Sequence, residues 1–418
     1  MTVKKHPIRE IIKDAVIVLL SCSIILLTLM AMPAGLLEKL TFLRPVAPLL
    51  GMELQEQAAP VPTTDLKAAA KPLTVSFRSA AGRMTLQRSA EAAAVYDQWS
   101  ALLGEALATA KDARSTGERE YLAALTEESI YFAYPGAIPP EALSRWLGAV
   151  DTAVTGPARE YALCLQGGEV RLWLSDPACR SWHTDLAPET LRKALGACTP
   201  DGSQFLFEQE NAPDLAPTTV LEQGTVQIPT ANWENPCGQG FGAELASALG
   251  FNPYGAGSYT DPLGNTVYTE SDRTCTVGTD GTVTIADGGN YEGFRTTQPT
   301  AERQIELARS LLQTICGGMT GDAELYLRDY VSENGESCCT FQYILDGVPL
   351  YPEAATTRFD ENGLRELTVT VRACRKNAQI TALMPLPQAA ALADPGSRLA
   401  AAYRFDSDGQ CSVGWMAQ

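Results

Sequence analysis

The sequence predicts an α+β fold held at a membrane by one N-terminal transmembrane helix. An uninterrupted apolar stretch at residues 15–32 predicts the membrane helix. Short strand-like segments separated by Gly- and Asp-containing turns, with a few helical patterns between them, predict antiparallel sheets further along the chain. Hydrophobic residues make up 45% of the 418 residues and charged residues 19%, which is typical of a chain that folds around a core.

Residues 15–32 form a stretch without a charge whose helical length, about 27 Å, is close to the thickness of a bilayer's hydrocarbon region. The stretch is longer than the apolar part of a secretory signal, and Pro33 follows it where a cleavage site would lie, so we expect a retained anchor rather than a cleaved signal. The preceding residues 1–14 are basic and predict a cytoplasmic tail, which places the rest of the chain outside the cell membrane. The basic residues are Lys4, Lys5, Arg9 and Lys13.

One side of the expected membrane helix carries Ser21, Ile24, Ile25 and Thr28. Small and hydroxylated side chains let two helices approach closely in lipid, so this side is a candidate face for contact with a partner's membrane helix. Ser and Thr also occur in passive anchors, and that alternative stays open.

The charge of the chain argues against a nucleic-acid partner. There are 49 Asp and Glu residues against 32 Lys and Arg, a net charge of -17, which repels phosphate backbones. Only two histidines occur, His6 and His183, so the commonest acid–base residue of enzymes is nearly absent.

Ten of the eleven cysteines follow the membrane helix, an even number that suits a disulfide framework outside the cell. Cys179 and Cys198 bracket a short helix and are the candidate disulfide pair. Cys338 and Cys339 are adjacent and should point to opposite faces of a strand. The alternative is that all ten are buried, reduced thiols.

The part outside the membrane begins with an Ala- and Pro-rich stretch at 51–72 that predicts a stalk. Residues 73–208 predict an α+β domain with a hairpin over 73–88, a hairpin turn at Gly167-Gly168 and three helices. The helices are expected at about 90–109, from Pro140 to about Gly148, and over 188–196.

A Pro-, Thr- and Asn-rich stretch at 209–236 predicts a linker. Residues 237–300 and 301–418 each begin with a helix, at about 242–250 and 301–316, and continue with short strands. This repeated plan predicts tandem helix-plus-antiparallel-sheet modules, the middle and the C-terminal one.

No catalytic, cofactor or metal site is predicted. His183 has no nucleophile motif near it. The acidic segments at 269–272, 359–363 and 405–409 lie between strand-like sequences and predict hairpin turns rather than calcium loops. The glycines of 238–245 lack the Lys-Ser/Thr of a P-loop.

Three long segments carry a resemblance to a known family, and they read ESIYFAYPGAIPPEAL, ALGFNPYGAGSYTDPLGNTVYTESDRTCTVGTDGTVTI and CTFQYILDGVPLYP. With the basic N-terminus and the single span, the chain resembles the YycH/YycI family over roughly residues 5–418. These are membrane-anchored regulators of the WalK (YycG)-type two-component sensor histidine kinase of Gram-positive bacteria. The resemblance implies a non-enzymatic regulator of cell-wall metabolism, whose membrane helix contacts the membrane helices of the kinase and which has a second YycH/YycI-like protein as a further partner. Ten exported cysteines depart from what the family leads us to expect.

Two other functions remain open. The chain could be a membrane-tethered binding or inhibitor module with a passive anchor. It could also be a cell-envelope hydrolase, which would need a cleft with a pair of carboxyl groups whose pKa values are strongly shifted.

Overall fold

The computed structural model describes residues 65–87, 95–149, 151–175, 178–210, 212–221, 226–255, 257–288, 292–295, 299–405 and 411–417. The chain divides into two compact units, 1–57 and 58–418, and every described residue belongs to the second. This unit is a mixed α+β structure dominated by two large sheets, which confirms the α+β part of the predicted fold class. No helix of the described ranges is long and apolar enough to cross a bilayer, and the expected membrane helix at 15–32 lies outside those ranges.

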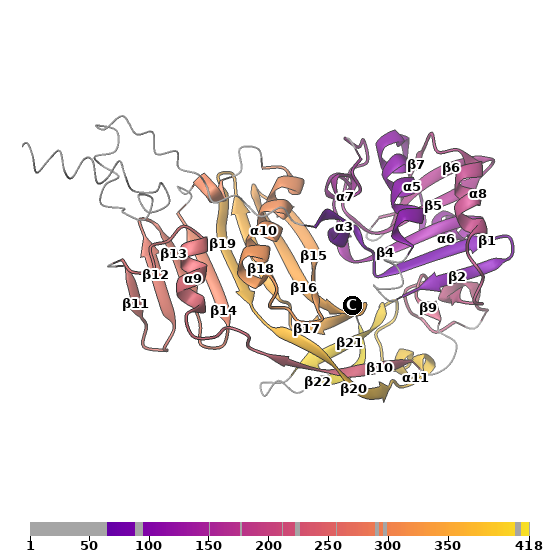
Figure 1. Cartoon of the computed structure of the whole chain (residues 1–418). Coiled ribbons are helices and arrows are strands. Elements are labelled where there is room, and N and C mark those ends of the chain that lie inside the picture. Colours follow the sequence, from indigo (N-terminus) through magenta and orange to yellow (C-terminus); the bar gives the residue numbers. More distant parts are fainter. Residues whose placement is uncertain are drawn as a thin grey trace, which may run out of the picture. The chain divides into compact units, whose positions relative to one another are not determined.

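The first sheet has seven strands in the order β2-β1-β4-β5-β6-β7-β3, with antiparallel pairing between neighbours (Figure 1). Its strands are β1 (Thr74–Ser79), β2 (Gly82–Leu86), β3 (Lys111–Ser115), β4 (Ser129–Ile138), β5 (Ala158–Gln166), β6 (Glu169–Ser175) and β7 (Arg180–His183). The predicted turn between β5 and β6 is confirmed, because Gly167 and Gly168 have φ values of 58° and 84°, which glycine adopts without strain.

Both faces of this sheet are covered. Helices α5 (Tyr96–Thr109), α7 (Pro140–Trp146) and α8 (Pro188–Gly196) pack on one face. Helix α6 (Glu118–Leu125) and the segment 204–221 pack on the other. That segment contains β8 (Gln204–Phe205), a short 3-10 turn (Leu206–Glu208) and β9 (Val220–Leu221).

The second sheet has eleven strands in the order β11-β12-β13-β14-β19-β18-β16-β17-β21-β22, with β15 also paired to β16. The pairing is antiparallel except between β17 and β21. Its strands are β11 (Ser258–Thr260), β12 (Thr266–Glu270), β13 (Arg273–Val277), β14 (Thr282–Asp287), β15 (Glu324–Glu333), β16 (Glu336–Leu345), β17 (Val348–Tyr351), β18 (Ala355–Asp360), β19 (Gly363–Thr370), β21 (Leu399–Phe405) and β22 (Cys411–Ala417).

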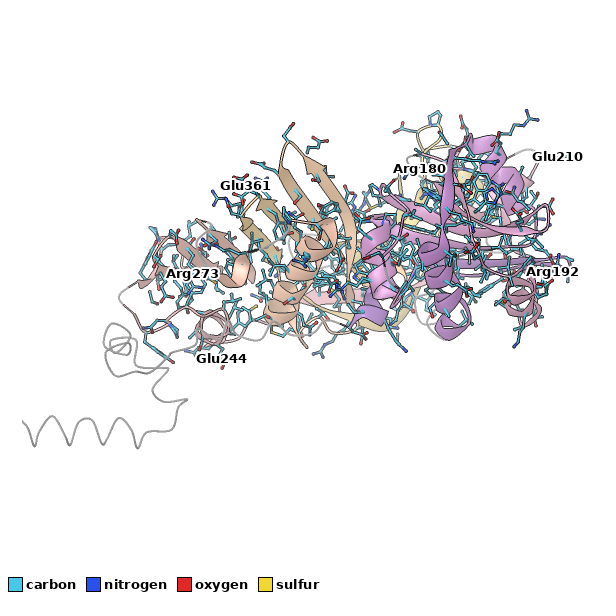
Figure 2. The ribbon with its side chains drawn as sticks, turned by 90° about the horizontal axis from the view of Figure 1, so that it is seen from above. Arg180, Arg192, Glu210, Glu244, Arg273 and Glu361 are labelled. Carbon is cyan, nitrogen blue, oxygen red and sulfur yellow. The ribbon has the colours of Figure 1, made fainter. Side chains whose placement is uncertain are left out.

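Helices α9 (Phe241–Ala248) and α10 (Ala301–Cys316) lie on one side of this sheet, as Figure 1 and Figure 2 show from two directions. The α10 side chains expected on one helix face, Ile305, Leu311, Leu312 and Ile315, are buried against it. Thr300 caps the helix by accepting a hydrogen bond from the backbone N–H of Arg303.

The middle and C-terminal modules predicted at 237–300 and 301–418 share this one sheet, because β14 pairs with β19 along its length. The acidic segments 269–272 and 359–363 are hairpin turns, β12 to β13 and β18 to β19, as predicted. Residues 406–410 lie outside the described ranges.

Residues 209–236 and 51–72, expected as linker and stalk, contribute ordered elements to the fold. Strand β10 (Gln227–Glu234) pairs with β20 (Ala373–Ala382) in a separate two-stranded ribbon, and α11 (Leu386–Ala390) follows it. Helix α3 (Leu66–Ala70) is capped by the Asp65 carboxylate and buries Ala70 completely. Polar and Pro-rich composition therefore concealed a strand and a helix that tertiary contacts stabilise.

Candidate functional site

The four residues predicted to face a partner in the membrane, Ser21, Ile24, Ile25 and Thr28, lie outside the described ranges. Any site in the unit 58–418 is formed by residues that were not predicted from the sequence.

The candidate disulfide between Cys179 and Cys198 is not formed in this structure. Cys179 packs with the side chains on the α6 face of the seven-stranded sheet, and its Sγ lies 3.4 Å from Ser175 Oγ. Cys198 packs with the cluster on the opposite face, and its thiol donates to the carbonyl of Ala194. The sheet itself separates the two sulfurs.

The carboxyl groups whose pKa values are shifted in the described ranges are held by hydrogen bonds in and around turns. Three carboxyl groups have shifted pKa values, Asp201, Asp261 and Asp280: burial raises each pKa, but hydrogen bonds from neighbouring backbone N–H groups outweigh burial and lower it. No group of three or more His, Cys, Asp or Glu side chains suited to a metal ion occurs in the described ranges. His183 Nδ1 lies 2.9 Å from Glu169 Oε2, and both residues are on the first sheet.

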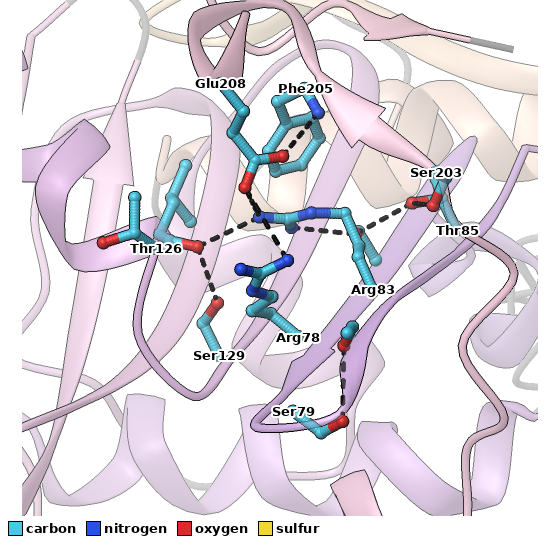
Figure 3. A network of polar contacts seen from close by, with 12 residues as sticks. Arg78, Ser79, Arg83, Thr85, Thr126, Ser129, Ser203, Phe205 and Glu208 are labelled. Atoms are coloured by element: carbon cyan, nitrogen blue, oxygen red, sulfur yellow. Dashed lines mark hydrogen bonds and ion pairs between the residues drawn. The ribbon is translucent and has the colours of Figure 1, made fainter.

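A buried arginine fastens the segment 204–221 to the first sheet (Figure 3). Arg83 is only 1% exposed, and it donates to Ser76 Oγ, to the carbonyl of Leu125 and to Glu208 Oε1, each at 3.1 Å. Its guanidinium also lies 4.0 Å from the ring centre of Phe205. Burial lowers the pKa of Arg83, and the charge of Glu208 opposes that effect. The partners of Arg83 come from β1, from the end of α6 and from the segment 204–221, so the network holds these elements together.

A second buried network joins the first sheet to the C-terminal part of the chain. Glu160 on β5 is 1% exposed and accepts from Tyr121 Oη at 3.1 Å and from Thr218 Oγ1 at 2.6 Å. It also forms an ion pair with Arg398, which precedes β21. Residues 160, 218 and 398 are far apart in sequence, so this contact ties three segments into the one compact unit.

The arrangement best suited to binding is the face of the eleven-stranded sheet that α9 and α10 leave uncovered, which we call the open face. Side chains alternate between the two faces of a strand. Five residues on the helix side are fully buried at 0% exposure: Cys275, Ile285, Leu367, Thr357 and Cys339. The residue next to each of them in sequence therefore belongs to the open face.

All five of these neighbours are threonines, and they are in register across five adjacent strands. The pairings Thr276 to Thr284, Thr284 to Thr368, Thr368 to Thr356 and Thr356 to Thr340 connect β13, β14, β19, β18 and β16. Thr356 is exposed and the other four are half-buried. We call these five residues the threonine row.

At the β13 end of the row the open face contains a hollow of about 360 Å³. Its polar lining comprises Asn265, Thr276, Thr279, Asp280, Thr282 and Thr284. The exposed side chain of Leu263 forms part of the rim. This hollow offers hydroxyl, amide and carboxylate groups without a basic side chain.

A second hollow of about 310 Å³ shares Asp280 with the first and has aromatic walls. The rings of Trp233 and Phe405 are stacked with centres 4.2 Å apart and planes 8° from parallel. The guanidinium of Arg372 lies 5.2 Å from the Trp233 ring and donates to the carbonyl of Asp280. Arg372 therefore helps to hold the turn that separates the two hollows.

The sequence contains a signal for the open face that we did not use. Threonine recurs at alternate positions in β13, β14 and β19, as Thr274 and Thr276, Thr282 and Thr284, and Thr368 and Thr370. Such alternation indicates a strand face. The order of the strands in the sheet is needed to bring the threonines into one row.

In comparisons with known proteins, no protein-family model matches the chain and no curated protein matches it.

Proposed function

We propose that the chain is a non-enzymatic, single-pass membrane regulatory protein that modulates a two-component sensor histidine kinase controlling cell-wall metabolism. The observation that carries the proposal is the uncharged stretch 15–32 preceded by the basic residues of 1–14. In this proposal residues 1–14 are cytoplasmic, residues 15–32 span the membrane, and the unit 58–418 is extracytoplasmic. The resemblance to the YycH/YycI family supports the kinase as partner and a second YycH/YycI-like protein as a further one.

The described unit supports a role in binding. Its buried charged groups, such as Arg83 and Glu160, have protein partners, and its open face presents ordered polar side chains on a rigid sheet. A regulator of this kind acts by lateral contact: a helix that binds one arrangement of the kinase better than another shifts the balance between them, with coupling of about 1–3 kcal/mol.

The test of helix contact uses the predicted face and its opposite. Ser21 and Thr28 lie on one side of a helix, whereas Ser23 lies on the other side, because each residue turns the helix by about 100°. Ser21→Leu with Thr28→Leu removes both hydroxyls and adds bulk on the contact side. Ser23→Leu makes the same kind of change on the far side and is the matched control.

With the kinase co-expressed, the double variant should lose regulation of a kinase-dependent reporter, and Ser23→Leu should keep it. Helix contact would be contradicted if the double variant regulated the reporter as well as Ser23→Leu does. It would also be contradicted if a chain whose residues 15–32 are replaced by an unrelated apolar helix of equal length kept regulation.

The open face favours a second candidate function, an extracytoplasmic binding module with a passive anchor. This alternative predicts full regulation after the helix replacement and loss of regulation when the open face is altered.

A further inference from the structure

We propose that the open face binds an uncharged, hydroxyl-rich glycan chain that lies across the strands along the threonine row. This inference rests on the proposed function in one respect, since an extracytoplasmic unit of a cell-wall regulator would meet wall glycans. Binding itself is a property of the folded unit and can be measured without the kinase.

The threonine row has the dimensions of an extended glycan site. Neighbouring strands are about 4.8 Å apart, so the five threonines span about 19 Å, enough for several sugar units in a line. The step from one strand to the next is similar to the length of one pyranose ring. A glycan running across the strands would therefore meet one hydroxyl per sugar unit.

The chemistry of the row suits sugars. Each threonine hydroxyl supplies one donor and two acceptor positions. The Oγ1 atoms of Thr284 and Thr368 are 3.4 Å apart, so they bond to one another and still have capacity for a ligand. Because Thr is β-branched and sits on a paired strand, its hydroxyl is held with little freedom to lose on binding.

The row continues toward the β11 edge with a side chain that can stack on a sugar. Thr276 pairs with Val267, and Val267 pairs with Tyr259, which is 56% exposed. The hollow lies at the turns beside Thr276 and Thr284, and the amide oxygen of Asn265 and the carboxylate of Asp280 in its lining can accept hydrogen bonds from sugar hydroxyls. A flat aromatic ring and a set of polar hydrogen-bonding groups on the same sheet match the two faces of a pyranose, one apolar and one polar.

At the β13 end of the row the local charge selects an uncharged ligand, because Asp280 and no Lys or Arg side chain lines the hollow there. At the β18 end the exposed Arg358 is ion-paired with Glu366. Residues 235–290 contain Arg273 as their only Lys or Arg. The side chain of Arg273 is buried and ion-paired with Glu270. The acids of this stretch are Glu244, Asp261, Glu270, Asp272, Asp280 and Asp287. Glu244 lies on α9 and Asp287 is buried, so the charge at this end of the open face comes chiefly from Asp261 and Asp280 at the turns, and it disfavours an anionic polymer.

The experiment measures binding of a fluorescently labelled hexamer of β-1,4-linked N-acetylglucosamine to the purified full-length protein in detergent micelles, by fluorescence anisotropy. Dextran sulfate serves as the polyanion, and reduced casein as an extended polypeptide. The triple variant Thr276→Val, Thr284→Val, Thr368→Val removes three hydroxyls and keeps the β-branched shape. Thr381→Val on β20, a half-buried threonine outside the open face, is the matched control.

We expect the wild type to bind the hexamer and not dextran sulfate. The triple variant should bind about tenfold more weakly or worse, because three neutral hydrogen bonds are lost, and Thr381→Val should bind as the wild type does. Tyr259→Ala changes a side chain that is 56% exposed and should also weaken binding, which provides a second readout if the triple variant misfolds.

The proposal would be overturned if the wild type did not bind the hexamer, or if the triple variant bound it as tightly as the wild type does. It would also be overturned if the wild type bound casein and not the hexamer, and the triple variant lost the binding of casein. The last result would assign the face to a protein partner. If the wild type binds the hexamer as expected but has no effect on a kinase-dependent reporter, the glycan site stands and the proposed regulatory function alone fails.

Discussion

Replacing Arg83 by methionine should destabilise the unit 58–418 strongly, because it breaks a buried ion pair from one side only. Arg83 is 1% exposed, and the side chain of Glu208 is 12% exposed. Methionine fills much of the same volume but donates no hydrogen bond. The carbonyl of Leu125, Ser76 Oγ and the Glu208 carboxylate then each lose a donor.

The cost follows from the burial of the group that remains. Removing one partner of a buried pair leaves a charge without its counter-ion and costs about 3–5 kcal/mol. Glu208 keeps the backbone N–H of Phe205, at 2.8 Å, and Arg78, at 3.9 Å, so we expect the lower half of that range, about 3–4 kcal/mol.

The assay is hydrogen exchange of the full-length protein in detergent, followed by mass spectrometry of the peptides that cover 204–221. These peptides should lose protection in Arg83→Met, since Glu208 and Phe205 are the contacts through which the arginine holds this segment. Arg78→Met is the matched control. Arg78 faces the same carboxylate but is about one-third exposed, so its loss should cost about 1 kcal/mol or less. Unchanged protection in Arg83→Met, or equal losses in the two variants, would refute the reasoning.

Three further predictions concern packing, thiol reactivity and pH. Gly136→Ala should destabilise the contact of β4 with β15, since an added Cβ would lie 1.3 Å from the carbonyl oxygen of Arg328; a thermal melt that matches the wild type would contradict it. Iodoacetamide at pH 8 should modify Cys338 well before Cys339. Burial raises the pKa of both thiols, that of Cys339 to about 12, but Cys338 is half-buried on the open face and Cys339 is fully buried. Peptide mass spectrometry that finds Cys339 modified first would count against the register. The pKa of Asp201 is lowered in the folded state, so the ionised carboxylate stabilises the fold at pH values above its unfolded pKa, and this stabilisation is lost as the pH falls below about 4. Asp201→Asn should therefore lose less stability than the wild type between pH 5 and pH 3, as measured by denaturant titrations.

Local sequence patterns predicted many of the helices and turns of the fold. Helix α8 begins at Pro188 and ends at Gly196 as the proline and glycine positions predict, and α10 occupies 301–316 with its apolar stripe buried. The vicinal pair Cys338-Cys339 lies on β16 with one thiol half-buried and the other buried, which confirms the expected opposite faces. Each of these features depends on residues that are close to one another in the sequence.

Contacts between distant segments could not be predicted in the same way. Strand β10 pairs with β20 across more than a hundred residues, and the polar, Pro-containing sequence of β10 gives little sign of it. Arg83 and Glu208 are 125 residues apart, and neither stands out in a chain with 49 acidic residues. Strand alternation assigns Thr284 and Thr368 to a face, but only the sheet order β14-β19 makes them neighbours.

The candidate disulfide shows the same limit. Cys179 and Cys198 flank α8 and are close in sequence, but they belong to opposite faces of the seven-stranded sheet. Sequence spacing bounds how far apart two sulfurs can be, and it does not reveal that a sheet lies between them.

The central claim, that residues 15–32 span the membrane and the unit 58–418 lies outside the cell, is tested most directly by labelling Cys338 in intact cells. A membrane-impermeant maleimide is applied before and after permeabilisation, and modification of the Cys338 peptide is measured by mass spectrometry, with Cys338→Ser to confirm the assignment. The account predicts modification of Cys338 in intact cells, to an extent that permeabilisation does not increase. Modification that appears only after permeabilisation would place the unit inside the cell and contradict the account.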